Sequence, residues 1–137
     1  LIDMIRLADL RQPIFGGDGF DNSSLHFKDE TDVYFTTHVF LDVQSTDPNI
    51  AQFIKHYYQH YEEYPDSAFA ALGYDSCNLL ADAIKRANSY KTKDLLKSLD
   101  DTKDFPAITG KISYHNGSHV PTKPVTIVAV KNGKKEV

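Results

Sequence analysis

The stretch from Ser67 to Ala87 constrains the fold more than any other part of the sequence. Its apolar residues recur at three- and four-residue intervals, which is the spacing of one face of an α-helix. These residues are Ala68, Ala71, Leu72, Cys77, Leu79, Leu80, Ala83, Ile84 and Ala87. Because several of the side chains are small, we expect a long helix that packs closely against a sheet. We interpret Cys77 as a small core residue of this helix.

Shorter segments predict three further helices. Pro13 and Pro65 each limit a helix, because proline has no backbone N–H to donate and restricts the residue before it. Asp47 offers a side-chain acceptor at a helix start, with Pro48 in the first helical position. The predicted helices cover about 2–10, 48–64 and 92–100. Pro13 ends the first of these helices, and Thr92 caps the start of the last.

Strands are predicted where β-branched and aromatic residues gather. The expected strands are 14–15, 32–37, 109–114 and 125–130. We expect the first of them, 14–15, to be buried. A loop around Asn116-Gly117 separates the last two, and Asn132-Gly133 forms a closing turn. Strands and helices that alternate in this way predict an α/β fold.

The charge of the chain excludes some classes of partner. Its 137 residues include 15 Lys and Arg against 19 Asp and Glu, for a net charge of −4. This balance leaves no broad basic field for a phosphate backbone, so nucleic acid is not an expected partner. The opening residues, Leu1–Met4, lack the charged and apolar regions of a signal peptide. We therefore expect a fragment whose export signal lies outside this chain.

Several patterns that could support catalysis or metal binding are incomplete. His56 and His60 lie one helical turn apart, but Tyr57 stands where a zinc-protease motif needs Glu. The acidic residues within 18–22 lack the spacing of a calcium loop, and no Ser/His/Asp or Cys/His set can be assembled. We therefore predict no catalytic residue, no metal and no cofactor. An enzyme built around the Gly-Asp-Gly turn remains an alternative.

Asp18 is the strongest candidate for a binding residue. It lies between Gly17 and Gly19 in a predicted turn that follows the strand at 14–15, which is where ligands dock in open α/β sheets. Glycines let a ligand approach the backbone closely, and a carboxylate is a suitable acceptor for an ammonium group. Alternatively, Asp18 only supports the turn. The turn by itself leaves both interpretations open.

Four motifs follow one another along the chain in a recognisable order. They are PIFGGDGFD at 13–21, VYFTT at 33–37, AALGYD at 70–75 with LLADAI at 79–84, and ITGKISY at 108–114. The series resembles the C-terminal part of the bacterial type 1 periplasmic binding proteins. Within that family it is most similar to the branched-chain amino acid (Leu/Ile/Val) substrate-binding proteins of ABC transporters. The resemblance covers nearly the whole chain.

The resemblance implies a two-lobed fold of parallel sheets flanked by helices, of which this chain is the C-terminal part. Residues 1–35 and 122–137 would be pieces of the second lobe, and 36–121 would form crossover segments and a piece of the first lobe. It also implies capture of a small-molecule amino acid for a membrane permease. The expected location is the periplasm or the outer face of the cytoplasmic membrane. A ligand-sensing receptor domain of the same fold is the alternative function.

The resemblance also assigns roles to four residues. Asp18 matches the acidic residue that grips the ligand's α-ammonium group, and Phe69 matches an aromatic residue that packs on the ligand side chain. Phe20 and Tyr74 are looser ligand-binding candidates. Phe69 could instead belong to the core and Tyr74 could face the sheet. Phe20 could either cover the mouth of the cleft or fasten the turn.

The chain departs from the family pattern in two respects. Only seven residues separate Leu25 from Val33, where many relatives carry a helix followed by Ala-Glu-Gly. The first-lobe residues that hold the ligand's α-carboxylate are absent, so we expect the isolated chain to bind amino acids weakly or not at all. Uncovered sheet edges and apolar helix faces would favour self-association of such a fragment.

Overall fold

The computed structural model describes residues 1–22, 27, 31–115 and 117–137, which form two compact units. The first combines Leu1–Thr37 with Thr126–Val137 and is called the sheet unit below. The second is continuous, from His38 to Val125, and is called the helical unit. Strands dominate the first unit and helices the second, in agreement with the predicted α/β class.

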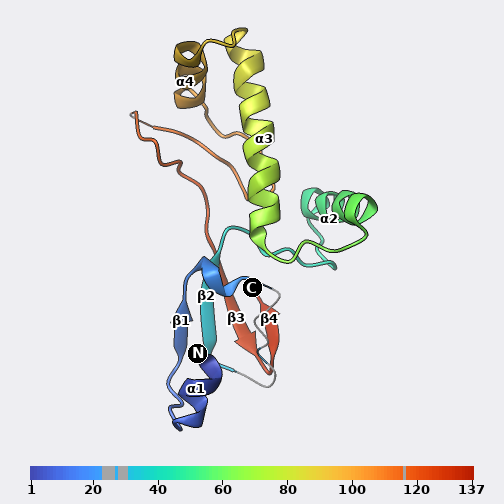
Figure 1. The fold of residues 1–137 in the computed structure, drawn as a ribbon, viewed down its shortest axis with the longest axis vertical. Helices are drawn as coiled ribbons and strands as arrows, with labels where there is room; N and C mark the ends of the chain where they lie inside the picture. The colour runs from blue at the N-terminus through green and yellow to red at the C-terminus, as the bar shows by residue number, and fades with distance from the viewer. Residues whose placement is uncertain (23–26, 28–30, 116) are drawn as a thin grey trace. The chain divides into compact units, whose positions relative to one another are not determined.

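The sheet unit contains a four-stranded sheet (Figure 1). Its strands, in spatial order, are β1 (Ile14–Gly16), β2 (Val33–Thr37), β3 (Thr126–Lys131) and β4 (Lys134–Glu136). β1 runs parallel to β2, whereas β3 is antiparallel to both β2 and β4. The strands predicted around 14–15, 32–37 and 125–130 are therefore confirmed. The sheet itself is mixed rather than wholly parallel.

The turn between β3 and β4 follows from two residues. Asn132 and Gly133 have φ angles of 47° and 75°, and a two-residue hairpin turn with both φ angles positive favours Asn-Gly. The predicted turn is confirmed, and β4, which was not predicted, completes the hairpin.

The core of the sheet unit lies on one face of its sheet. Val33, Phe35, Val128 and Val130 are at most 1% exposed. The opposite face is open, and Phe15 of β1 is 77% exposed there. The prediction of a buried strand at 14–15 is wrong for Phe15, because the register places it beside Tyr34, with 5.4 Å between the ring centroids.

The first helix, α1 (Ile2–Leu7), ends earlier than predicted. Ala8 is its C-cap, and Asp9 has a φ angle of 57°, in the left-handed region that turns the chain away from the helical path. The helix thus stops before Pro13 is reached.

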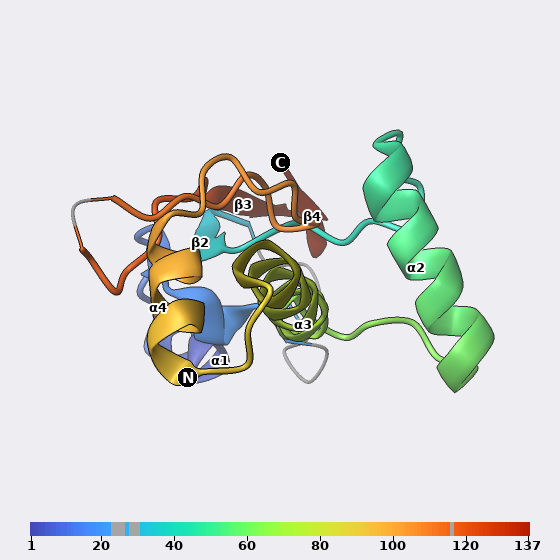
Figure 2. The same cartoon turned by 90° about the horizontal axis from the view of Figure 1, so that it is seen from above.

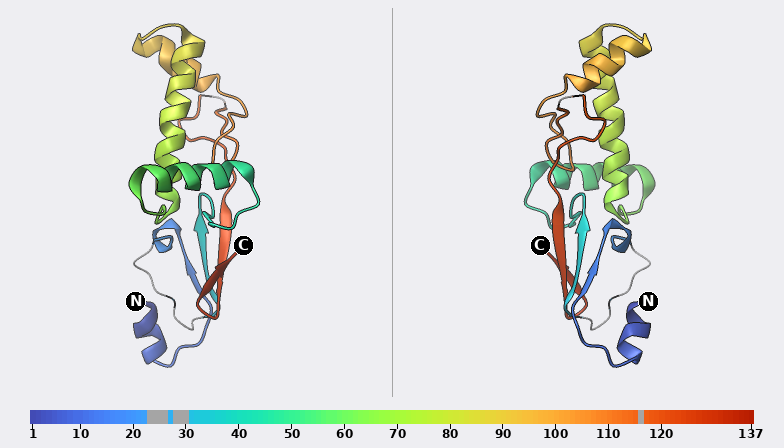
Figure 3. Two further views of the ribbon diagram at one scale, coloured as in Figure 1. Left: turned by 90° about the vertical axis from the view of Figure 1, so that its right-hand side faces the viewer. Right: turned by 90° about the vertical axis from the view of Figure 1, so that its left-hand side faces the viewer.

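The helical unit is built on the long helix predicted from the apolar stripe, α3 (Ala68–Ala87). Seen along α3, α2 (Pro48–Tyr61) lies to one side of that helix (Figure 2). Figure 3 shows α2 crosswise near the beginning of α3 and α4 (Thr92–Asp100) beside its last turns. The Asp47 carboxylate accepts hydrogen bonds from the N–H groups of Asn49 and Ile50, at 2.8 and 3.4 Å. The predicted cap and the end of α2 before Pro65 are confirmed.

The cap of α4 differs from the prediction. Lys91 occupies the N-cap position and Thr92 is the first helical residue. Ser89 fastens the helix start instead, because its Oγ accepts from the Lys91 N–H at 3.1 Å and donates to Asp94 Oδ2 at 2.7 Å.

The predicted strand at 109–114 is wrong. Only isolated bridges form in this region, Phe105 with Ile112 and Ser113 with Thr122. Two features oppose a longer strand: the Thr109 N–H is bonded to a side chain of α3, and Gly110 has a φ angle of 97°. Asn116, in the predicted loop, lies outside the described residues.

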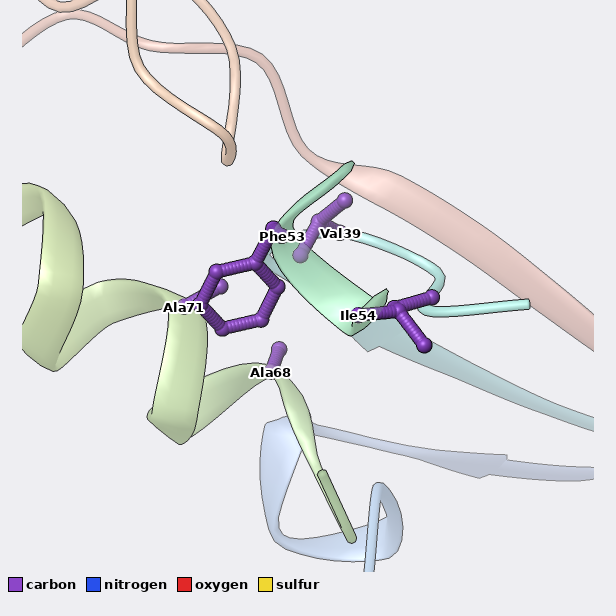
Figure 4. Close-up of a cluster of buried hydrophobic side chains, with 5 residues drawn as sticks. All are labelled: Val39, Phe53, Ile54, Ala68 and Ala71. Carbon is purple, nitrogen blue, oxygen red and sulfur yellow. The ribbon is translucent and has the colours of Figure 1, made fainter. Parts of the chain in front are cut away.

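A small apolar cluster joins α2 to α3 (Figure 4). The ring of Phe53 from α2 lies against Ala68 and Ala71 of α3, with Val39 and Ile54 beside it. The small residues of α3 therefore receive another helix. Among residues 38–115 and 117–125 there is no strand ladder that could form the expected sheet beneath it.

Cys77 is exposed, so its interpretation as a core residue is wrong. The buried stripe of α3 consists of Ala68, Ala71, Asp75, Leu79 and Ala83, and Cys77 lies on another side of the helix.

Among the helices of the described residues, none has the length and apolar composition of a membrane-spanning segment.

Candidate functional site

Asp18 lies on a short turn that follows β1. Residues Asp18–Phe20 form a single 3₁₀ turn. The Phe20 N–H donates to the Gly17 carbonyl at 3.1 Å, and the Asp21 N–H donates to the Asp18 carbonyl at 2.9 Å. The turn is therefore closed by its own backbone, as expected at the carboxyl end of this strand. Asp18 itself is exposed.

The glycines of this turn have different roles. A Cβ atom on Gly16 would lie 2.6 Å from Cδ2 of Phe20, so the phenyl ring occupies the space that a side chain would need. At Gly17 and Gly19 an added Cβ would meet nothing within 4 Å. The fold requires a glycine at 16, whereas the surroundings of 17 and 19 are open to an approaching group.

Phe20 connects the turn to the core of the sheet unit. Its ring lies on Gly16 and is 6.4 Å from the ring of Phe35, measured between centroids. Of the two interpretations of Phe20, this packing fits a residue that fastens the turn.

A polar network that was not predicted lies behind the turn. Asp21 is 8% exposed and accepts a hydrogen bond from Thr37 Oγ1 at 2.7 Å. Its other carboxylate oxygen lies 3.5 Å from the ammonium nitrogen of Lys135 on β4. That ammonium group also lies over the ring of Phe35, 5.5 Å from its centroid. Asp21 thus joins the turn to the end of β2 and to β4.

The other two predicted residues, Phe69 and Tyr74, lie in the helical unit. Both are about half exposed and line a groove of about 780 Å³ between α2 and α3. Phe69 lies edge-on to His38, with 6.5 Å between centroids, and the Tyr74 ring is 5.4 Å from Phe53. Phe69 is therefore not buried within this chain, and Tyr74 packs toward α2.

Below this groove, a buried carboxylate fixes the segment after α4. Asp75 is 2% exposed, and its two oxygens accept from the N–H groups of Ile108 and Thr109 at 2.8 and 2.9 Å. Lys123 donates to Thr109 Oγ1 at 2.7 Å. Burial lowers the pKa of Lys123, and the Asp75 carboxylate acts in the opposite direction. Asp75 therefore anchors two loop amides to the middle of α3.

The residues considered for metal binding do not assemble into a centre. His56 and His60 are exposed on α2 and border the groove. Within the described residues, no group of three or more His, Cys, Asp or Glu side chains is placed to hold a metal ion.

The structure thus brings the predicted residues together in two pairs. Asp18 and Phe20 share one turn, and Phe69 and Tyr74 share one groove wall in the other unit. The buried carboxylates of Asp21 and Asp75 were not predicted from the sequence. A signal existed for Asp75, because it interrupts the apolar stripe of α3 at a core position, where an acidic residue needs polar partners.

Comparisons with known proteins agree on a family. The sequence profile described as "Periplasmic binding protein" matches residues 5–135. None of the curated proteins matches the chain significantly.

Solved structures resemble the chain closely in fold. One is the branched-chain amino acid transporter substrate-binding protein LivJ from Streptococcus pneumoniae in complex with isoleucine. It is 30% identical, with a TM-score of 0.78 over 99% of this chain and 39% of its own length. The leucine-binding protein LivK from Thermotoga maritima is 29% identical, with a TM-score of 0.75 over 97% of this chain and 38% of its own.

A third match is more distant. The solute-binding protein from R. palustris in complex with benzoate is 20% identical, with a TM-score of 0.73 over 98% of this chain and 37% of its own. The chain thus spans about two fifths of the length of the solved structures that it matches.

Proposed function

Because this chain belongs to the periplasmic binding protein family, we propose that it is part of a solute-binding protein that captures an amino acid for an ABC transporter. Proteins of this family bind solutes and are not enzymes. The proposed ligand is a branched aliphatic amino acid. Support comes from LivJ and LivK, at 30% and 29% identity, which are described as binding isoleucine and leucine, respectively.

We assign the two units to the two lobes of such a protein. The sheet unit would belong to the second lobe and the helical unit to the first, with the remaining parts of both lobes supplied by residues outside this chain. The ligand would be held between the lobes and would stabilise the closed form only to the extent that it contacts both of them. The closed form would then dock on a permease in the membrane, from the periplasm or the outer face of the cytoplasmic membrane.

The exposed carboxylate of Asp18 is the observation that carries this proposal. It lies on a turn closed by its own backbone at the carboxyl end of a parallel strand, between two glycines with open surroundings. A fixed carboxylate is a strong acceptor for an α-ammonium group, and the pairing gains strength in a cleft that excludes water. Asp18 would therefore bind the ammonium group of the ligand.

Aromatic residues would supply apolar contacts for the ligand's side chain. Phe69 is the principal candidate, because its ring is half exposed at the start of α3 and borders a groove. Tyr74, on the same groove wall, and Phe20, beside Asp18, are secondary candidates.

A thermal-shift panel of amino acids on the natural protein that contains this chain tests the proposal. We expect leucine, isoleucine or valine to raise the melting temperature most. Replacement of Asp18 by Ala should weaken binding of the same amino acid by about 1–3 kcal/mol, the range for loss of a charged hydrogen-bond partner. The matched control is Asp3→Asn, which changes an exposed carboxylate on α1 and should leave affinity unchanged.

Two results would contradict this function. One is an absence of any amino-acid ligand in the panel, and the other is an Asp18→Ala variant that binds as tightly as the natural protein. Residues 1–137 alone should bind the same amino acid weakly or not at all, because they would contact only one of its two charged groups. Tight binding by the isolated chain, measured by calorimetry, would contradict the two-lobe assignment.

A further inference from the structure

We infer that Asp21 is a positioning residue, which holds Asp18 in the orientation that binds the ligand's ammonium group. The inference rests on the proposed function and extends it to a residue three positions along the chain. It is carried by the contacts of Asp21 within the sheet unit, where backbone and side chain bond to different partners.

The backbone of Asp21 is bonded directly to Asp18. Its N–H donates to the Asp18 carbonyl at 2.9 Å and so closes the 3₁₀ turn on which the binding carboxylate lies. Asn22 adds a second bond on the same side of the turn, from Nδ2 to the Gly19 carbonyl at 3.1 Å. The position of Asp21 is therefore coupled to that of Asp18 by this hydrogen bond and by the two residues between them.

The side chain of Asp21 is attached to the sheet at two points. Oδ2 accepts from Thr37 Oγ1 at 2.7 Å, and Thr37 is the last residue of β2 and is 2% exposed. Oδ1 faces the ammonium group of Lys135 at 3.5 Å, and that group lies over the rings of Phe35 and Phe27, at 5.5 and 5.9 Å from their centroids. The turn is thus attached to the buried end of β2 and to a partly buried lysine of β4.

The burial of this charged network favours positioning over stability alone. Removing a carboxylate and an ammonium group from water has a free-energy cost that their attraction offsets only in part, and apolar residues of similar size often stabilise a fold as well. A partly buried ion pair such as this one can also select one arrangement, because each charge is most stable beside its partner. Directly behind the exposed Asp18, that property would keep a binding carboxylate oriented before the ligand arrives.

Calorimetry with L-leucine and L-isoleucine on the natural protein, in four forms, tests the inference. The forms are the natural sequence, Asp18→Ala, Asp21→Asn and the double variant. We expect Asp21→Asn to weaken binding by about 3- to 10-fold, since one charge and one acceptor contact are lost. If Asp21 acts through Asp18, the Asp21→Asn substitution should not weaken binding further in the Asp18→Ala variant. Its effect on the melting temperature without ligand should be the same in both backgrounds.

Two conservative variants keep the test informative if Asp21→Asn folds poorly. Thr37→Val removes only the hydroxyl donor, and Lys135→Met removes the charge while it keeps a stem to cover the rings. Each should weaken binding in the natural background and leave it unchanged in the Asp18→Ala background. If Asp18→Ala abolishes measurable binding, Asp18→Asn replaces it in the cycle. Asp3→Asn again serves as the control for a lost carboxylate.

The outcomes separate the inference from the proposed function. If Asp18→Ala weakens binding but Asp21→Asn has no effect, or reduces affinity by the same factor in both backgrounds, the positioning role is wrong and the proposed function stands. If no amino acid binds, or Asp18→Ala has no effect, the proposed function fails and the positioning role fails with it.

Discussion

The two units hold their candidate binding residues in different ways. In the sheet unit, Asp18 lies on a turn closed by backbone bonds and fastened to a buried sheet face by Phe20 and Asp21. In the helical unit, Phe69 and Tyr74 project from the surface of a helix. A turn attached at several points fixes a charge, whereas the half-exposed rings, packed on His38 and Phe53, offer apolar surface to a ligand.

The cores of the two units also differ, in the size of the buried side chains and in the share of polar contacts. The sheet unit buries large side chains almost completely, with Phe35 at 1% exposure. The cluster of the helical unit contains two alanines among its five residues, and the polar anchor of Asp75 lies beside it on α3. This contrast suggests that apolar burial dominates the stability of the sheet unit, whereas a buried carboxylate has a large share in the helical unit.

The largest expected effect comes from the core of the sheet unit. Phe35→Ala should lower the free energy of unfolding of this unit by about 3–5 kcal/mol, because a large cavity replaces a buried ring. Hydrogen exchange of residues 1–137, followed by mass spectrometry on peptides from β2 and β3, measures the change locally. Phe15→Ala is the matched control: its ring is 77% exposed in this chain and stacks on Tyr34, so its loss should cost at most about 1 kcal/mol. Equal effects of the two variants would contradict the view that apolar burial dominates the stability of the sheet unit.

The helical unit should respond next most strongly, to Asp75→Ala. The change leaves the N–H groups of Ile108 and Thr109 without their acceptor, at a cost of about 2–3 kcal/mol. Faster hydrogen exchange in the segment around Thr109, with β2 and β3 unchanged, is the expected result. Asp82→Ala is the matched control, because it removes a carboxylate of the same helix that pairs with Arg86 near the surface. This change should lower the free energy of unfolding by at most about 1 kcal/mol. If protection from hydrogen exchange around Thr109 is unchanged in Asp75→Ala, apolar packing rather than the carboxylate stabilises the helical unit.

A smaller effect should distinguish the glycines of the Asp18 turn. Gly16→Ala forces a methyl group against the Phe20 ring and should cost about 1–3 kcal/mol, the usual range for overpacking. Gly17→Ala meets no neighbouring atom and has a φ angle of −87°, so stability should change by about 0.5 kcal/mol or less. Thermal unfolding of both variants measures the difference. A destabilised Gly17→Ala variant would show that the turn needs more than the space for Phe20.

The smallest expected effect is a pH dependence in the helical unit. Burial lowers the pKa of Lys123 below its ordinary value of 10.5. Between the lowered pKa and 10.5, the folded protein has released this proton while the unfolded chain still holds it, so stability rises with pH. Relative to Lys123→Met, the natural protein should therefore gain stability as the pH approaches 10.5. A difference in unfolding free energy that stays constant from neutral pH to 10.5 would contradict this.

Local signals in the sequence predicted most of the elements. The helix α3, the Asp47 cap of α2 and the Asn132-Gly133 turn were each predicted from neighbouring residues, and the structure confirms all three. Asp18 was placed correctly on a turn after β1 for the same reason.

Predictions that depended on distant partners were less successful. The β-branched residues of 109–114 predicted a strand, but Asp75, more than thirty positions away, captures the Thr109 N–H. Cys77 has apolar neighbours in sequence, yet the side of α3 that is buried is set by α2 and by the loop after α4. The Asp21 network joins a turn, the end of β2 and β4, and no local pattern could reveal that combination.

The pairing of β2 with β3 has a consequence for how the protein is made. Thr37 pairs with Thr126, and all of 38–125 lies between these partners in the chain. Residues 38–125 are therefore all synthesised before β3, whereas β2 must wait for the segment 126–137 to find its antiparallel partner. Until then the edge of β2 that β3 will occupy has no partner strand, and its backbone N–H and C=O groups are open to pairing with another chain.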